Sequence, residues 1–176
     1  MHFSATSETI RALRRLVRAL RLADRAAEAR FGVSAAQLFV LEQLAETPLR
    51  SLSEVAERTM TDASSVSVVV QKLTDQGLVV RSVDPKDARR STLRLSAAGR
   101  RLLERAPASP QSRLVAAVNA LPAAQRRQLA ALLDRMVRGM RLEAAEAPMF
   151  FEGEPRRARL PHSRRAVQRR RKHRGG

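Results

Sequence analysis

The stretch that decides the fold is residues 51–95, SLSEVAERTMTDASSVSVVVQKLTDQGLVVRSVDPKDARRSTLRL. Two short helical patterns come first, and two strand-like runs follow on either side of a basic loop that opens on Asp-Pro. These five segments are residues 51–59, 63–76, 78–83, 84–90 and 91–96. Two helices followed by a basic β-ribbon are typical of a protein that reads double-stranded DNA, and such a protein needs neither catalytic groups nor a cofactor.

Local signals mark the ends of the two helices. Ser51 and Glu54 form an S-x-x-E capping box for the first helix, and Thr61 or Asp62 can cap the second. Gly77 is expected to end the second helix. The core side of this second helix should carry Val66, Val69 or Val70, and Leu73. Its first turn is rich in hydroxyls, which suits either helix capping or contact with nucleic acid.

A longer amphipathic pattern precedes this unit. It spans about residues 7–30, with Ser7 as its cap, Gly32 as its stop and arginines along one face. Another helix is expected to start at Ser34 and to end before Pro48.

The helical pattern resumes after the second strand, with Ser96 as a cap. It covers about residues 97–145 and is interrupted at Pro107 and Pro110. The apolar residues of its last part are Leu129, Leu132, Leu133, Met136 and Met140. Because a small winged unit has little surface to cover both terminal helices, we expect them to pack together and against a second copy of the chain.

The 176-residue chain is strongly basic. It holds 34 Lys and Arg against 17 Asp and Glu, a formal charge of +17, which favours a polyanionic partner. Residues 151–176 alone hold ten basic and two acidic residues, a net +8. We predict a disordered basic tail over residues 148–176, either solvated or bound non-specifically to phosphates.

Several classes of protein are disfavoured by the composition. Without Cys there is no disulfide, thiolate metal site or cysteine nucleophile, and without Trp or Tyr base-stacking platforms are unlikely. No apolar run approaches the ~18 residues of a membrane span, so we expect a cytoplasmic protein. The three His lie near the chain ends, and no HExxH, GxSxG or glycine-rich phosphate loop is present. We therefore expect no enzymatic activity, cofactor or metal.

Four residue strings resemble the MarR family of winged-helix transcriptional regulators. They are FGVSAAQLFVLEQL at 31–44, SLSEVAERT at 51–59, SSVSVVVQKLTDQGLV at 64–79 and VDPKDARRSTLRLSAAGR at 83–100. The Asp-Pro-x-Asp-x-Arg wing in the last string is the most specific. The resemblance covers about residues 8–142 and implies a mainly α fold with a small β-wing (α+β). It divides the chain into a MarR-like domain at 1–147, with the winged helix at about 34–97 and dimerisation helices at about 7–30 and 97–145.

The resemblance also implies which residues contact DNA. In the recognition helix they are Ser64, Ser65, Ser67, Val68, Gln71 and Lys72, and in the wing they are Lys86, Asp87, Arg89 and Arg90. Asp87 would brace the wing by pairing with Arg89, and the wing cations would enter a minor groove. Many relatives carry a basic residue at the position of Val68, which implies that this chain reads fewer guanines there.

We therefore expect a homodimeric, sequence-specific regulator, most simply a repressor, on a pseudo-palindromic operator whose half-sites lie about 34–36 Å apart. The resemblance suggests a small aromatic or phenolic effector between the dimer-forming helices and the winged unit, without identifying its pocket. Two alternatives stay open. One is a non-specific architectural DNA-binding protein, and the other is a protein-interaction adaptor whose winged domain no longer reads DNA.

Overall fold

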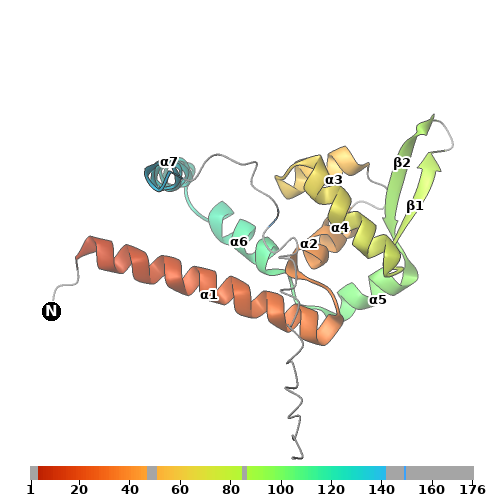
Figure 1. Cartoon of the computed structure of the whole chain (residues 1–176), viewed down its shortest axis with the longest axis horizontal. Coiled ribbons are helices and arrows are strands. Elements are labelled where there is room, and N and C mark those ends of the chain that lie inside the picture. The colour runs from red at the N-terminus through yellow and green to blue at the C-terminus, as the bar shows by residue number, and fades with distance from the viewer. Residues whose placement is uncertain (1–3, 47–50, 85–86, 142–148, 150–176) are drawn as a thin grey trace, which may run out of the picture.

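A computed structural model describes residues 4–46, 51–84, 87–141 and 149. Within these residues the chain forms seven helices and a two-stranded antiparallel sheet (Figure 1). In chain order the elements are α1 (Ala5–Phe31), α2 (Ala35–Glu46), α3 (Leu52–Thr59), α4 (Ala63–Asp75), β1 (Val79–Asp84), β2 (Asp87–Leu95), α5 (Ala97–Arg105), α6 (Pro110–Asn119) and α7 (Ala123–Gly139). The expected mainly α fold with a small β-wing is confirmed.

Helix α2 is the centre of the molecule. It packs against α1, α3, α4, α5, α6 and β2, and nine of its twelve residues are buried. The apolar core around it includes Leu41 and Leu44 of α2, Val55 of α3 and Leu73 of α4. Such a helix is apolar on nearly every side because it has neighbours on nearly every side. The expected core side of α4 is confirmed, and Val69 and Val70 are both buried.

Most of the expected helix caps are present. The side chains of Ser51, Asp62 and Ser96 accept backbone N–H groups at the starts of α3, α4 and α5. Gly32 ends α1 in the left-handed conformation. The cap predicted at Ser7 is wrong, because α1 begins earlier and Ser4 accepts the N–H of Ser7. A serine three residues upstream offered an equivalent local signal.

The sheet is longer than the sequence predicted. The strand pairing runs from Val79 opposite Leu95 to Val83 opposite Ser91, and an irregularity follows before Asp84 pairs with Asp87. Residues 84 and 87–90, expected in the connecting loop, therefore belong to the strands. The hydroxyls of Ser82 and Thr92 lie 2.9 Å apart across the ribbon, and this cross-strand contact supports the extended pairing.

The C-terminal helices break where the two prolines predicted. Helix α5 ends at Arg105, and α6 starts at Pro110 with Ser109 as its cap. Helix α7 ends at Gly139, whereas the sequence predicted a helix to residue 145; residues 142–148 lie outside the described part. Met149 belongs to the predicted tail but is only 4% exposed, among the core residues.

The ribbon and α4 lie at one end of the molecule, and α7 and the start of α1 lie at the other (Figure 1). None of the helices in the described part is long and apolar enough to cross a membrane. This arrangement leaves α4 and the ribbon free for a partner at one end of the molecule.

Candidate nucleic-acid interface

Helix α4 has one buried face and one open face. Val66, Val69, Val70 and Leu73 fix the helix on the core. Among the predicted DNA-contacting residues of this helix, the exposed ones are Ser64, Val68, Gln71 and Lys72. Val68 is 47% exposed although it is apolar, so its methyl groups are available to a partner. The spacing of Ser64, Val68 and Gln71 places them on one side of the helix.

The start of α4 is organised by Asp62. One carboxylate oxygen accepts the backbone N–H of Ser65 at 2.7 Å and the hydroxyl of Ser64, and the other accepts the Ser65 hydroxyl at 2.8 Å. The Ser64 hydroxyl, then the N–H and the hydroxyl of Ser65, hold the pKa of the Asp62 carboxyl well below its ordinary value. Two of the predicted DNA-contacting serines are thus held in fixed positions.

The three serines differ in what they can offer a partner. Ser64 is exposed, Ser67 is half-buried, and Ser65 is only 7% exposed. The hydroxyl protons of Ser64 and Ser65 point to Asp62, so their oxygens remain as acceptors. The contact predicted for Ser65 has the smallest free surface of the set, and it stays a prediction.

Gln71 occupies the middle of the open face. Its amide nitrogen donates to Asp75 at 2.9 Å, one helical turn on. The second amide hydrogen and the carbonyl oxygen remain free, and this pair matches the donor and acceptor of an adenine edge.

The end of α4 is tied to the rest of the winged unit by two glutamines. The Gln37 amide donates to the Gln76 carbonyl oxygen at 2.9 Å, and the Gln76 amide donates to the backbone carbonyl of Gly32 at 3.2 Å. Gln37 also caps its own helix, since it exchanges hydrogen bonds with Ser34. The end of α4 is therefore connected to the turn between α1 and α2, a link that local sequence signals did not indicate.

The ribbon of β1 and β2 follows α4 and projects away from the helices (Figure 1). Asp87, Arg89 and Arg90 lie in β2, and Lys86 lies outside the described residues. The side chains of residues 83–91 are not described, so the predicted ion pair between Asp87 and Arg89 stays a prediction. Two cations that the sequence analysis did not single out, Arg81 and Arg94, are exposed nearer the base of the ribbon.

The described residues hold no group of three or more His, Cys, Asp or Glu side chains that could bind a metal ion. The Asp62 carboxylate is occupied by two hydroxyls and a backbone N–H group. The chemistry that this end of the molecule presents is hydrogen bonding, methyl contact and positive charge.

Comparison with known proteins agrees with this geometry. Residues 31–90 match the model of the MarR family. The structure is similar to that of a MepR-like protein solved with pseudoligands, with 20% identity over 76% of this chain and 94% of that one and a TM-score of 0.53. It also matches YusO from Bacillus subtilis (25% identity, 77% and 99% of the two chains, TM-score 0.49). A third match is BpsR from Bordetella bronchiseptica (27% identity, 73% and 98%, TM-score 0.49), whose DNA binding is regulated by 6-hydroxynicotinic acid. A comparison with curated protein sequences gave no match.

Proposed function

Because residues 31–90 form a MarR-family winged helix, we propose that this DNA-binding regulator is a cytoplasmic, homodimeric repressor of a pseudo-palindromic operator. The observation that carries the proposal is the two-faced α4. Its core side is locked by four buried apolar residues, and its other side exposes a methyl-bearing valine, a glutamine and a lysine.

Each exposed residue has a role that its chemistry allows. Val68 meets a thymine methyl, Gln71 reads an adenine edge, and Lys72 and the serines contact phosphates. In the adjacent minor groove, Lys86, Arg89 and Arg90 supply positive charge, and Asp87 orients Arg89. Arg81 and Arg94 add phosphate contacts at the base of the ribbon.

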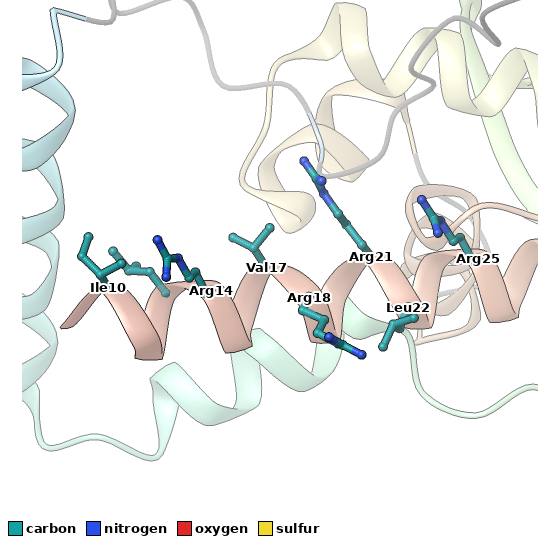
Figure 2. Close-up of a pocket in the computed structure, with 8 residues that line it drawn as sticks. Ile10, Arg14, Val17, Arg18, Arg21, Leu22 and Arg25 are labelled. Carbon is teal, nitrogen blue, oxygen red and sulfur yellow. The ribbon is translucent and has the colours of Figure 1, made fainter. Parts of the chain in front are cut away.

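A dimer follows from the apolar side chains that α1 and α7 expose. None of the α7 residues is buried, and its exposed apolar residues are Leu129, Leu132, Leu133, Met136 and Val137. On α1, the apolar residues alternate with arginines, and Arg14, Val17 and Arg21 project on the same side (Figure 2). Apolar surface of this extent marks an interaction site, and a second copy covers both helices at once. Two recognition helices then meet successive major grooves about 34–36 Å apart.

Repression is released when a small effector changes the spacing of the two recognition helices. The effector must bind one spacing more tightly than the other, since equal affinity shifts nothing. We place it between α6 and the winged unit, because α6 joins that unit to α7.

The proposal is tested by DNA binding with matched charge changes. Reversing Lys86, Arg89 and Arg90 to Glu should abolish binding to operator fragments selected from the source genome. A control with the same change in net charge reverses Arg101, Arg105 and Arg113, which are exposed on α5 and α6. Fluorescence anisotropy measures both variants on operator and scrambled DNA. Loss of binding in the control alone, or equal affinity of the wild type for both DNAs at physiological salt, contradicts the proposal.

A further inference from the structure

The turn that follows α4 is hydrogen-bonded to distant parts of the chain. It consists of residues 76–78, and Gly77 has the left-handed conformation with a φ of +68°. The Gln76 amide donates to the Gly32 carbonyl at 3.2 Å, and the Gly77 carbonyl accepts the Ser96 hydroxyl at 2.7 Å. Gly32 ends α1, and Ser96 caps α5. This one turn therefore joins α4 both to the long helix at the start of the chain and to the helix that follows the ribbon.

The link to α1 is a set of three hydrogen bonds. Gln37 Nε2 donates to Gln76 Oε1 at 2.9 Å, and Gln37 Oε1 accepts the backbone N–H of Ser34 at 2.9 Å. The bond from Gln76 to Gly32 is the third. Gln37 is only 7% exposed, so the bonds that it makes are partly shielded from water. Both amides donate and accept at once, which neither a carboxylate nor an apolar side chain can do.

The link to α5 includes a close approach of the two backbones. The Ser96 N–H donates to the Leu78 carbonyl at 3.0 Å, beside the bond from its hydroxyl to Gly77. A Cβ atom added at Gly99 would lie 2.3 Å from the same Leu78 oxygen, so α5 lies directly against the turn. Leu78, the end of α1 and α5 also line one groove. The three segments meet at a junction below the ribbon (Figure 1).

This junction constrains the direction of α4 more than its apolar contacts do. Apolar side chains hold the helix against α2 and α3, but hydrophobic attraction has no preferred direction. Hydrogen bonds weaken steeply when their distance or angle changes. At the start of α4 the bonds of Asp62 go to Ser64 and Ser65 of the same helix, whereas at its end they reach other elements. The end of α4 therefore fixes its orientation in the fold.

We propose that Gln76 is a positioning residue that sets the orientation of α4 relative to α1 and α5, and with it the half-site spacing that the operator must have. The inference rests on the proposed function, because spacing has a meaning only for two copies of α4 in a dimer. Helix α1 belongs to the proposed dimer interface, and α5 leads through α6 to α7. A change at Gln76 alters the separation of the two copies and removes no group that the proposed function places on DNA.

The separation of the two copies can be measured directly, because the chain has no Cys. Val68→Cys introduces a single thiol at a site that is 47% exposed, and a spin label attached there marks each α4. Pulsed electron paramagnetic resonance of the full-length labelled protein without DNA should give one narrow distance distribution. Gln76→Met removes both side-chain bonds at similar volume, and it should broaden or shift that distribution. Gln76 is exposed, so the fold should be kept, and a melting curve checks this.

DNA binding tests the spacing itself. Fluorescence anisotropy compares the selected operator with two versions in which one base pair is inserted or removed between the half-sites, a change of about 3.4 Å. Gln76→Met should lower the preference for the native spacing by about three- to tenfold, as expected for the loss of one or two hydrogen bonds. Gln71→Met is the matched control on the same helix. Because Gln71 is proposed to contact a base, its loss should weaken binding to all three DNAs by the same factor.

Two further variants test the two links separately. Ser96→Asp still accepts the N–H of Gly99 and caps α5, but it cannot donate to the Gly77 carbonyl. It should also lower the preference for the native spacing. Gln37→Met breaks the same bond as Gln76→Met, so the effect of the double variant on this preference should be smaller than the product of the two single effects.

Identical distance distributions in the presence and absence of Gln76→Met would overturn the inference. So would an equal loss of affinity on all three DNAs, since that pattern belongs to a weakened contact or fold. A wild-type protein without dipolar coupling refutes the proposed dimer and the spacing claim with it. A coupled dimer that binds scrambled and operator DNA equally refutes the proposed regulator alone, because the distance distributions still decide the role of Gln76.

Discussion

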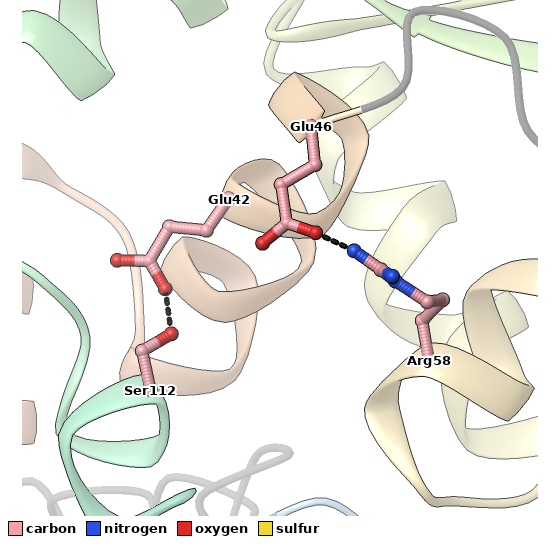
Figure 3. Close-up of polar contacts among 4 residues, drawn as sticks. All are labelled: Glu42, Glu46, Arg58 and Ser112. Carbon is pink, nitrogen blue, oxygen red and sulfur yellow. Dashed lines mark hydrogen bonds and ion pairs between the residues drawn. The ribbon is translucent and has the colours of Figure 1, made fainter. Parts of the chain in front are cut away.

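Replacing Glu42 with alanine should loosen the joint between α2 and α6. The Glu42 carboxylate accepts the backbone N–H of Ser109 at 2.6 Å and the Ser109 hydroxyl at 2.7 Å. It also accepts the hydroxyl of Ser112, as Figure 3 shows. Ser109 is fully buried, so its N–H group loses its acceptor when the carboxylate is removed. The carboxylate also lies at the start of α6, where negative charge is favourable.

The magnitude follows from these contacts. A hydrogen bond to a charged group contributes about 1.5–3 kcal/mol, but three bonds to one half-buried carboxylate are not additive, and water can enter. We expect Glu42→Ala to lower the free energy of unfolding by about 2–4 kcal/mol, which corresponds to a fall of roughly 5–15 °C in melting temperature. Because α6 leads into α7, the dimer should also dissociate more readily.

Glu46→Ala is a matched control one turn along the same helix. Glu46 pairs only with Arg58, and both side chains are about half exposed, so its loss should cost about 0–1 kcal/mol. Urea denaturation of both variants gives the comparison. A double-mutant cycle of Glu42→Ala with Ser112→Ala should show a coupling energy above about 0.5 kcal/mol. If Glu42→Ala and Glu46→Ala lower the free energy of unfolding by the same small amount, the Glu42 carboxylate does not hold α6 on α2.

Four further outcomes are expected. Gly99→Ala should destabilise the protein by about 1–3 kcal/mol, because the added Cβ collides with the Leu78 carbonyl. Gly139→Ala has open space around it and should stabilise the protein by up to about 1 kcal/mol. The denaturant midpoints of the two variants test this difference in sign. The lowered pKa of Asp62 means that its contribution to stability is complete above about pH 4 and is lost as the pH falls further, so the gap between wild type and Asp62→Ala should narrow in acid; a gap independent of pH would contradict this. Replacing the ten basic residues of 156–174 by Gln should reduce the slope of log affinity against log salt by up to about 9, with the operator-to-scrambled ratio unchanged; an unaltered slope would show that the tail does not touch DNA. Helix α1 carries seven arginines against three acids, and α7 carries four against one, so salt should screen the repulsion between these helices in the dimer. Sedimentation should therefore show tighter dimerisation as salt rises above about 0.1 M. Weaker dimerisation at higher salt would argue against contact between these helices.

The features that the sequence predicted are those encoded locally. Gly32, Asp62 and Ser96 end or start helices within three or four residues of the groups they satisfy, so their roles can be read from a short window. The choice between Ser4 and Ser7 failed because both satisfy the same local rule. Helix α4 was predicted in the same way, since its apolar residues recur at helical spacing and are buried.

The features that the sequence did not predict depend on contacts between distant parts of the chain. Ser109 lies 67 residues from Glu42, and Gln76 lies 39 residues from Gln37, so no local pattern joins either pair. The burial of Gln43 was not predicted either, because a glutamine beside a leucine stripe is expected on a solvated face, whereas this one is only 8% exposed. The two strands are longer than predicted because cross-strand pairing, and not the β-propensity of single residues, sets their length.

Three acids of this strongly basic chain satisfy backbone N–H groups at helix starts. Asp24, Glu42 and Asp62 each accept a backbone N–H at the start of a helix, from Ala35, Ser109 and Ser65 at 2.7, 2.6 and 2.7 Å. A carboxylate at a helix start is stabilised by the helix dipole and by the N–H groups that have no partner in the helix itself. These three acids therefore stabilise the starts of α2, α6 and α4. Arg81 and Arg94 of the ribbon are exposed, so their positive charge is available to phosphates.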